Sequence, residues 1–520
     1  MSLVQHLPTD ESSVDGLRLF NILWLSATAL VVWIVILLLL QRLGLPLAYA
    51  VGGLVVWTGL FALVMSFVGR SMTSSHFFFA NNMGVASQLG VSGLGDWVSG
   101  AFLALFFGIS FSGQIVVAVS LALALMLHAA LFARAIQYAK VATVPGFFAW
   151  RYRSQLLGVV VLFVTSAISF ALMAAEFELL QILASDLPLL SGEMGPVVLV
   201  IFAVLPALFG GWLSLALINS VLAVWMLIMV LVPAIAVGLL PGLIRSDLVV
   251  EAAATTLPVL EFAAPQWSLF EPGQGWVSLA LLMYVLTCGL CCLPTAFSRS
   301  SLHARPGAAL EGIAWSSLGL FLIFSAAPLS LLLIAGDAAS PAAAVLSQNP
   351  VLHALPYFAI LIAVYNAFSA TLLVASGSVV RALRRSRNLD PGEQSMFSTR
   401  MLAVVLAVGL LVMPAHILPN PVDLLIWAVM LGACSLFWPL VFSIWISKIP
   451  AVASGLSVVA SPALALVLFY DQKWQPVEAT AVGMALGFLI LVAGGILLRL
   501  RGKPHDDTRL AELRRSDAIS

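Results

Sequence analysis

Val91-Ser-Gly-Leu-Gly-Asp-Trp-Val-Ser-Gly100 and Thr287-Cys-Gly-Leu-Cys-Cys-Leu-Pro294 each put glycine or proline near the middle of a long apolar run. Two interrupted membrane helices at corresponding positions of two halves indicate the midplane substrate site of a transporter. Irregular backbone at that depth is tolerated only where it is buried in protein or lines a cavity. The two stretches therefore predict a chain that moves a solute across a membrane.

The composition of the chain does not fit a soluble protein. Its 520 residues are 62% hydrophobic and 9% charged, with a formal net charge of zero, and the mean hydropathy is +1.10. Apolar runs of about 20 residues, the length needed to cross a bilayer, follow one another along the chain. No polar interval is long enough for a soluble domain, and no Walker A motif occurs. We expect one domain in the lipid bilayer, without a cofactor and without a nucleic-acid partner.

The apolar runs number about fourteen, so the predicted fold class is an all-α integral membrane protein. The predicted spans lie near residues 18–41, 46–69, 84–112, 114–136, 156–182, 194–209, 212–240, 276–297, 310–335, 353–380, 401–416, 422–446, 449–470 and 477–499.

Lysine and arginine indicate the orientation, because basic loops stay on the cytoplasmic side of a membrane. With a cytoplasmic N-terminus, all of the 23 basic residues except Arg42, Arg245 and Lys473 fall on the inner side. The first 17 residues lack the basic start and cleavage site of a signal peptide. We predict a multi-pass protein of a bacterial inner, or plasma, membrane with both termini in the cytoplasm.

The interrupted spans are the third and the eighth, and each begins a set of five. An odd number of helices per set gives the two sets opposite orientations, which is the inverted-repeat plan of many secondary transporters. This plan divides the chain into a cytoplasmic segment 1–17, two peripheral helices in 18–69, the repeat core 70–447, two further helices in 448–500 and a cytoplasmic tail 501–520.

Six short stretches between residues 70 and 450 match a known family in order and spacing. They are Phe77-Phe-Phe-Ala-Asn-Asn-Met83, Gly95-Asp-Trp-Val-Ser-Gly-Ala101, Thr143-Val-Pro-Gly-Phe-Phe-Ala-Trp-Arg-Tyr-Arg-Ser154, Gly210-Gly-Trp-Leu-Ser-Leu215, Leu293-Pro-Thr-Ala-Phe297 and Ala363-Val-Tyr-Asn-Ala-Phe-Ser-Ala-Thr-Leu-Leu-Val-Ala-Ser-Gly-Ser378. With them the chain resembles the sodium:solute symporter family, and the second stretch is similar to its acetate and proline permease branches. The resemblance implies a LeuT-like fold of five plus five helices and a cation-coupled transporter of small organic solutes.

The sodium site of that family is altered in this chain. The resemblance assigns two adjacent sodium-binding hydroxyl residues to the eighth core helix, where this chain has Asn366 and Ala367. An acidic position of the fifth core helix is occupied by Asn219, which is a further candidate for binding the substrate or the ion. A hard cation needs several oxygen ligands to replace its water shell. Asn366 and Ser369 are the candidate Na⁺ ligands, and coupling to Na⁺ and to H⁺ both stay open.

Asp96 is the first candidate for binding the substrate or the ion. A carboxylate at membrane depth is costly and usually faces a cavity or pairs with a cation. Alternatively, it caps the second half of the broken helix. Ser92, Trp97 and Ser99 flank the break, and each either lines the substrate site or packs against a neighbouring helix.

Further candidates lie on two other spans. Glu176 is a candidate proton or substrate contact, and a place at the outer surface is the alternative. Glu178 faces another direction, because residues two apart on a helix do not share a face. Asn366 and Ser369 share a face that we expect to point at the first broken helix, although such residues also hydrogen-bond between membrane helices.

Two arginines and two histidines are not assigned to the substrate or ion site. Arg299 and Arg305 follow the Leu-Pro turn and are interpreted as orientation signals on the inner side; a contact with a substrate carboxylate in the inner vestibule is the alternative. His128 and His416 are interpreted as interfacial residues, with a proton relay as the alternative.

The leading functional hypothesis is a secondary active transporter that works by alternating access. The half-helix N-terminus favours an anionic substrate group, as in a monocarboxylate or an amino acid. The alternative is a transporter-like membrane sensor that acts with a separate signalling kinase. An integral membrane enzyme is disfavoured, because no nucleophile–base pair or metal-ligand set stands out.

Overall fold

The computed structural model of the protein describes helices and their connections, with no strand in the described part of the chain. That part comprises residues 11–43, 47–71, 73–79, 86–109, 111–139, 141–185, 192, 194–239, 276–302, 306–334, 350–386, 393–413, 418–446, 449–471 and 474–500. The predicted tail 501–520, the first ten residues of the predicted N-terminal segment, Arg305 and His416 lie outside it.

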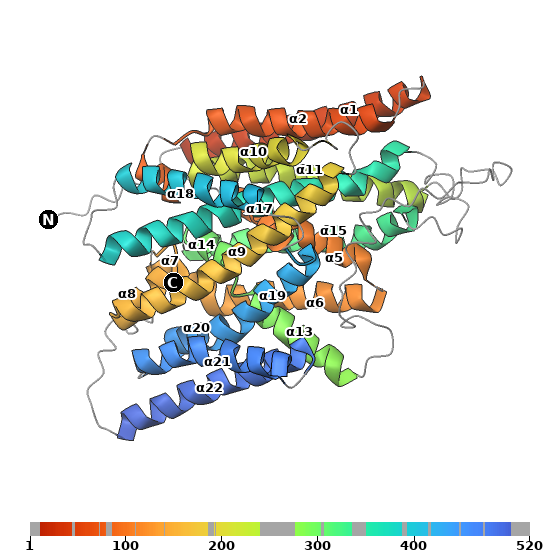
Figure 1. The fold of residues 1–520 in the computed structure, drawn as a ribbon. Coiled ribbons are helices and arrows are strands. Elements are labelled where there is room, and N and C mark those ends of the chain that lie inside the picture. The colour runs from red at the N-terminus through yellow and green to blue at the C-terminus, as the bar shows by residue number, and fades with distance from the viewer. Residues whose placement is uncertain are drawn as a thin grey trace.

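Two long helices form one flank of the molecule. They are α1 (Glu11–Arg42) and α2 (Leu47–Val68), followed by the short α3 (Ser74–Phe79). Figure 1 shows α1 and α2 side by side along one edge, next to α10 (Met194–Phe209) and α11 (Gly211–Leu239). Large apolar side chains of α1 such as Trp24 and Leu25 are exposed. A surface of this kind is suited to contact with lipid tails.

The first predicted set of five spans becomes a run of helices with several breaks. After α4 (Ala86–Trp97) come α5 (Gly100–Gly108), α6 (Phe111–Leu127), the wider π-helical turn η2 (His128–Ala133), α7 (Arg134–Ala139), α8 (Val144–Tyr152), α9 (Gln155–Ser185), α10 and α11.

The second set follows the same plan with a break in its first member. It comprises α13 (Trp276–Leu290), α14 (Pro294–Ser300), α15 (Pro306–Ile334), α17 (Pro350–Ser386), α18 (Glu393–Val412), α19 (Pro421–Gly432), the π-helical turn η5 (Ala433–Phe437) and α20 (Trp438–Trp445). The last two helices, α21 (Ala451–Asp471) and α22 (Pro476–Leu500), pack on each other along the flank opposite α1 and α2 (Figure 1).

The described helices agree with the predicted spans. Ten are long and apolar enough to cross a membrane, or up to twelve when each bent pair counts as one span. Two shorter apolar helices, Gly52–Val68 and Met194–Phe209, stand at the positions of the remaining two predicted spans. The all-α, multi-span fold class is therefore confirmed.

Helix α17 forms the centre of the core. All its residues from Phe358 to Ser378 are buried, and it packs against α9, α10, α11 and α5. The span Gln155–Ser185 of α9 is less buried. Because a membrane-spanning helix that is covered on all sides faces no lipid, it can carry polar residues such as Asn366 and Ser376 without exposing them to hydrocarbon.

The short helix α8 begins and ends at residues typical of helix caps. Thr143 Oγ1 accepts a hydrogen bond from Gly146 N at 3.2 Å, and Pro145 follows in the first turn of α8. Such a cap and an early proline are typical of a helix start. The helix ends at Arg153, whose φ of +51° is left-handed. Glycine is the residue that adopts this conformation most readily.

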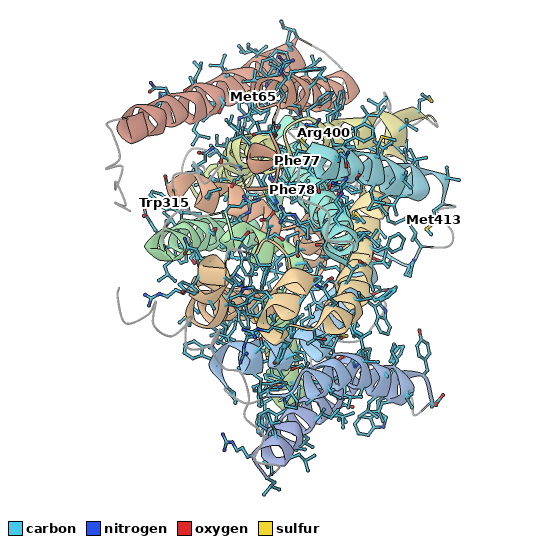
Figure 2. The ribbon with its side chains drawn as sticks, turned by 90° about the vertical axis from the view of Figure 1, so that its left-hand side faces the viewer. Met65, Phe77, Phe78, Trp315, Arg400 and Met413 are labelled. Carbon is cyan, nitrogen blue, oxygen red and sulfur yellow. The ribbon has the colours of Figure 1, made fainter. Side chains whose placement is uncertain are left out.

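Segments that were predicted to lie on the inner side contact one another. Arg400 Nη2 donates to Ser71 O at 2.9 Å and to Phe209 O at 3.0 Å, and its guanidinium lies 5.1 Å from the centre of the Phe77 ring (Figure 2). Arg381 lies over the Phe78 ring at 4.2 Å. These contacts bring Arg381 and Arg400 together with Ser71, Phe77, Phe78 and Phe209 at one end of the helix bundle.

Candidate functional site

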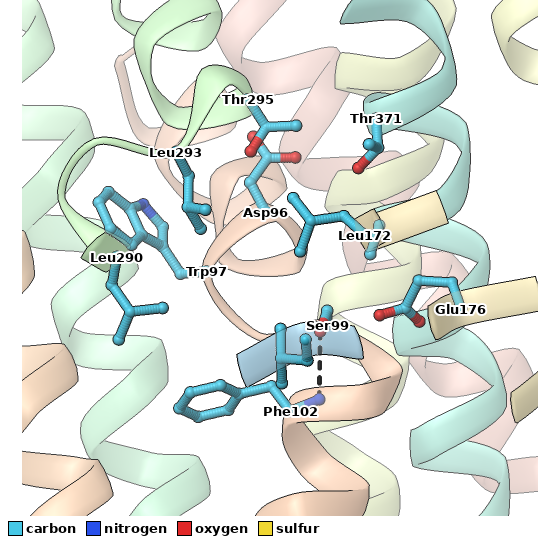
Figure 3. Close-up of a pocket in the computed structure, with 12 residues that line it drawn as sticks. Asp96, Trp97, Ser99, Phe102, Leu172, Glu176, Leu290, Leu293, Thr295 and Thr371 are labelled. Atoms are coloured by element: carbon cyan, nitrogen blue, oxygen red, sulfur yellow. Dashed lines mark hydrogen bonds between the residues drawn. The ribbon is translucent and has the colours of Figure 1, made fainter. Parts of the chain in front are cut away.

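The first broken helix is interrupted at Val98 and Ser99. Helices α4 and α5 meet there at an angle of 59°. Ser99 has an extended backbone and its Oγ accepts a hydrogen bond from Phe102 N at 3.1 Å, so it is the N-cap of α5 (Figure 3). The predicted break therefore lies beside Asp96 and Trp97, and the capping role that was weighed for Asp96 belongs to Ser99.

Glu176 of α9 closes the exposed backbone at that break. Its Oε2 accepts a hydrogen bond from Gly100 N at 3.1 Å, and its Oε1 accepts one from Ala101 N at 3.2 Å. The side chain is buried, with 1% of its surface exposed, so the alternative of an outer-surface position is wrong. A carboxylate at the first amides of a helix meets unpaired N–H donors and the positive end of the helix dipole.

Gly100 makes this approach sterically feasible. A Cβ at this position would lie 2.2 Å from Val364 Cγ2 of α17 and 2.8 Å from Glu176 Oε2. The glycine is therefore required for close packing of α5 against both α9 and α17, in addition to its place in the break.

In the second broken helix, His128 contacts residues on both sides of the break. Helices α13 and α14 meet at 47°, and Pro294 begins α14. His128 Nδ1 lies 2.8 Å from Cys291 O, and its Nε2 lies 2.8 Å from Ser300 Oγ. His128 is buried in η2, so its interpretation as an interfacial residue is wrong.

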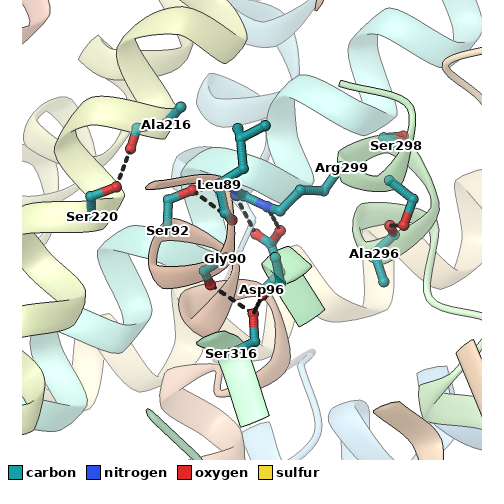
Figure 4. Close-up of polar contacts among 12 residues, drawn as sticks. Leu89, Gly90, Ser92, Asp96, Ala216, Ser220, Ala296, Ser298, Arg299 and Ser316 are labelled. Atoms are coloured by element: carbon teal, nitrogen blue, oxygen red, sulfur yellow. Dashed lines mark hydrogen bonds and ion pairs between the residues drawn. The ribbon is translucent and has the colours of Figure 1, made fainter. Parts of the chain in front are cut away.

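An ion pair joins the two broken helices. Arg299 of α14 donates through Nε and Nη2 to both carboxylate oxygens of Asp96, the second bond measuring 3.1 Å, and through Nη1 to Ser92 Oγ (Figure 4). Both partners are buried. Bidentate guanidinium–carboxylate pairs are among the strong hydrogen-bonded contacts in proteins.

The pair corrects the interpretation of Arg299 as an orientation signal. Its guanidinium also lies 5.2 Å from the centre of the Trp212 ring in α11, within the range of a cation–π contact. Arg299 therefore contacts α4 and α11 from within the protein. The sequence around Arg299 does not indicate its pairing with Asp96, because the two residues are 203 positions apart.

A small cavity lies between the two breaks. Its volume is about 20 Å³, room for about one water molecule. Figure 3 shows the side chains that enclose it. The lining residues come from both broken helices and from α9, α17 and α19, and they are Asp96, Trp97, Ser99, Phe102, Leu172, Glu176, Leu290, Leu293, Thr295, Ala367, Thr371 and Leu425.

Two hydroxyl residues of the cavity were missed by the sequence analysis. Thr295 follows the proline of the second break, and Thr371 lies one turn beyond Ala367 on α17. Helical spacing from Ala367 identifies Thr371 as a residue on the same face. The structure thus brings Asp96, Trp97, Ser99 and Glu176 together as predicted candidates around one cavity.

The other predicted residues lie away from the cavity lining. Asn366 packs against Gly95 of α4, where a glycine Cβ would lie 2.5 Å from Asn366 Cβ. Neither polar atom of its buried amide has a hydrogen-bond partner among the described residues. Asn219 of α11 is also buried, and its Nδ2 has no described partner. Ser92 contributes to the site through Arg299.

The two candidate Na⁺ ligands contact different helices. Asn366 faces α4, whereas the Ser369 hydroxyl is hydrogen-bonded to Ala203 O of α10 and to Tyr365 O at 2.7 Å. A shared cation would have to lie where the Asn366 amide oxygen and a lone pair of the Ser369 hydroxyl oxygen both reach it. Sodium binding by Asn366 and Ser369 stays a prediction.

Comparison with known proteins supports the fold. Neither a protein-family model nor a curated protein sequence matches the chain. The structure is similar to a Na⁺-coupled sialic acid symporter in its substrate-bound, outward-open state, with 13% identity, a TM-score of 0.65, and coverage of 88% of this chain and 98% of the symporter. It is also similar to Mhp1, a nucleobase-cation-symport-1 family transporter, with 12% identity, a TM-score of 0.53, and coverage of 84% and 98%. The chain has the LeuT-like fold of membrane transporters.

Proposed function

We propose that the protein is a secondary active transporter that moves a small organic solute by alternating access and couples its movement to a cation. The observation that carries this proposal is the meeting of two broken helices at a buried cavity with ionisable side chains. Discontinuous helices at the midplane supply backbone donors and acceptors to a substrate. Asp96 and Glu176 are buried acids. An ionisable residue inside a membrane span is costly, so each of the two is a candidate functional residue.

The small cavity indicates which state of the transport cycle the structure represents. A volume of about 20 Å³ is too small for an organic solute. The site must therefore widen on one side of the membrane before a solute binds, and on the other side before it leaves. We assign the structure to a closed state between these two openings. The end of the bundle that carries α8 and Arg400 is placed in the cytoplasm, following the distribution of basic residues.

The solute class follows from the helix ends at the cavity. The N-terminus of α5 favours an anionic group, because its first amides point at the cavity wall. A monocarboxylate or an amino acid satisfies this preference. Na⁺ and H⁺ are the two candidate coupling ions, with Asn366 as a candidate sodium ligand and the cavity acids as candidate proton carriers.

Uptake by purified protein in proteoliposomes tests the proposal. The labelled solutes are acetate, lactate, proline and uracil, each offered under a sodium gradient and under a proton gradient. We expect gradient-driven accumulation of at least one of them above the level of protein-free liposomes. Ala367→Trp fills the cavity and should abolish this uptake, whereas Val405→Trp places the same ring on an exposed position of α18 and should leave it unchanged.

The outcome that contradicts transport is also defined. If no solute accumulates while a histidine kinase co-purifies with the protein, the sensor hypothesis is favoured. Uptake that persists unchanged in Ala367→Trp would place the solute path elsewhere in the bundle.

A further inference from the structure

The anion-binding end of α5 is already occupied by a carboxylate of the chain itself. Both oxygens of Glu176 accept hydrogen bonds from the first amides of α5, at 3.1 Å and 3.2 Å. The same carboxylate lines the cavity between the two broken helices (Figure 3). A solute carboxylate that binds to these amides must therefore take the place of Glu176.

Glu176 differs from the other acid of the cavity in its partners. Asp96 is paired with Arg299, so its charge is balanced within the protein. The partners of Glu176 are uncharged, namely the two α5 amides and the Ser99 hydroxyl, and no basic side chain pairs with it in the described part of the chain. A buried carboxylate that lacks a cation is the group of the site that is most readily neutralised by a proton.

We propose that Glu176 is a tethered carboxylate that occupies the anion site of the transporter, and that its protonation frees this site for the carboxylate of the solute. This proposal rests on the proposed transport function and specifies its substrate class as organic monocarboxylates and its coupling ion as H⁺. A proton from the side of higher proton concentration converts Glu176 from –COO⁻ to –COOH. The hydrogen bonds from Gly100 N and Ala101 N then lose their charge assistance and become about half as strong. The negatively charged solute then displaces the neutral side chain.

The charge balance of this cycle is defined. One H⁺ enters with one RCOO⁻, so each turnover carries no net charge across the membrane. When the solute leaves on the opposite side, the proton leaves Glu176 as well, and the ionised side chain returns to the α5 amides. Sodium is not required at Asp96, because Arg299 already supplies the positive charge there.

The ionisable groups on the helices around Glu176 decide whether another residue can account for a pH dependence. Helices α5 and α10, which pack on α9, carry none. Among the described side chains, the remaining ionisable groups on α9 and on the helices packed against it are Glu178 of α9, Arg299 of α14, Arg151 and Tyr152 of α8, Asp423 of α19, Tyr357, Tyr365, Arg381 and Arg384 of α17, and Tyr470 and Asp471 of α21. Asp96 of α4 shares the cavity, and α17 also contains His353 and Arg385, whose side chains are not among those described.

The first experiment measures opening of the site without any solute. Ala367→Cys is introduced at the cavity wall after Cys288, Cys291, Cys292 and Cys434 are replaced by alanine, and its reaction with N-ethylmaleimide is followed between pH 5.5 and pH 8. Every labelling rate is divided by the rate at which free N-acetylcysteine reacts at the same pH, because only the thiolate reacts and its share falls with the pH. We expect labelling to become about tenfold faster as the pH falls, because the helix end is released when Glu176 is neutralised. Exchange of Na⁺ for K⁺ should have no effect.

Glu176→Gln tests the assignment of this pH dependence. The amide has the shape of the protonated acid, so labelling of Ala367→Cys in this background should be fast at every pH. Glu178→Gln is the matched control on the same helix, and it should retain the pH dependence. Slow labelling at every pH in Glu176→Gln, or an unchanged pH profile, would overturn the proposal. Thermal unfolding of each variant in detergent shows whether it is folded.

The second experiment measures transport. Labelled acetate and lactate should accumulate in proteoliposomes under an inward proton gradient, without Na⁺, and a potassium diffusion potential set with valinomycin should not change the rate. Glu176→Gln should exchange acetate across the membrane but should not accumulate it. Accumulation that depends on Na⁺ or on membrane potential would contradict the proposal. Uptake of uracil or proline without any uptake of acetate or lactate would leave transport intact and reject this inference, whereas no uptake of any solute would reject transport itself.

Discussion

The two broken helices solve the same structural problem with opposite chemistry. At the first break, Ser99 and Glu176 satisfy the amides at the start of α5, and Asp96 adds a second acid. At the second break, the start of α14 has Pro294 and no side-chain cap, and His128 contacts the carbonyl of Cys291 instead. The first break is acidic, and the second carries the basic partner Arg299.

This difference shows how the polar backbone of two helix interruptions is satisfied in the hydrophobic interior. Each break by itself leaves polar backbone groups that cost free energy in lipid. Joined by the Asp96–Arg299 pair, they form one connected polar region at the centre of the helix bundle. Four substitutions test how far this description of the two breaks holds.

Loss of the ion pair should have the largest effect. Arg299→Ala leaves Asp96 buried without its cation, and we expect a loss of about 3–5 kcal/mol in the free energy of unfolding. Unfolding in detergent measures this loss. The double variant Asp96→Asn with Arg299→Leu removes both charges and should recover most of it. Arg384→Ala, which loses one side-chain contact of 3.3 Å to Ser398 Oγ, is the control and should change stability little.

A methyl group at the first break should have the next largest effect. In Gly100→Ala the new Cβ would lie 2.2 Å from Val364 Cγ2, and we expect a destabilisation of about 1–3 kcal/mol from overpacking. Gly409→Ala in α18 is the matched control, because a methyl group added there would have no neighbouring atom within 4 Å. If Gly100→Ala is as well tolerated as this control, then α5 is not tightly packed against α17.

Removal of the histidine at the second break should have a moderate effect. His128→Phe keeps a ring of similar shape but leaves Cys291 O and Ser300 Oγ without the imidazole, so a loss of about 1–2 kcal/mol is expected. Ser300→Ala removes one of the two contacts and should cost about half as much. The two unfolding curves measured side by side give this ratio, and equal losses would mean that the contact with Cys291 contributes nothing.

The cap of the first break should have the smallest effect. Ser99→Ala removes the acceptor of Phe102 N and should cost about 1 kcal/mol. Ser99→Thr retains the hydroxyl and should be nearly neutral. Equal stability of both variants in the same unfolding assay would show that Glu176 alone secures the start of α5.

Much of the fold could be predicted because its signals are local. Apolar runs of membrane length mark the spans, and the Ser99–Gly100 and Leu293–Pro294 pairs lie at the two bends. Positions of the helices follow from these runs without knowledge of their neighbours.

The partners in the site could not be predicted in the same way. Arg299 and Asp96 are 203 residues apart, and His128 is 163 residues from Cys291. Helical spacing shows which residues share a face, but it does not show which helix covers that face. For this reason Ser369 was expected to point at the first break, whereas its hydroxyl is bonded to Ala203 O of α10.

The narrow cavity has a consequence for the search for ligands. When the form that binds a solute is only a small fraction of the population, the apparent dissociation constant exceeds the intrinsic one by the inverse of that fraction. A binding screen against the protein in its closed state would therefore underestimate the affinity of true ligands. A weak binding signal in such a screen would not show that a compound is a poor substrate. Antibody fragments that stabilise an open state should raise the measured affinity of every transported solute by the same factor.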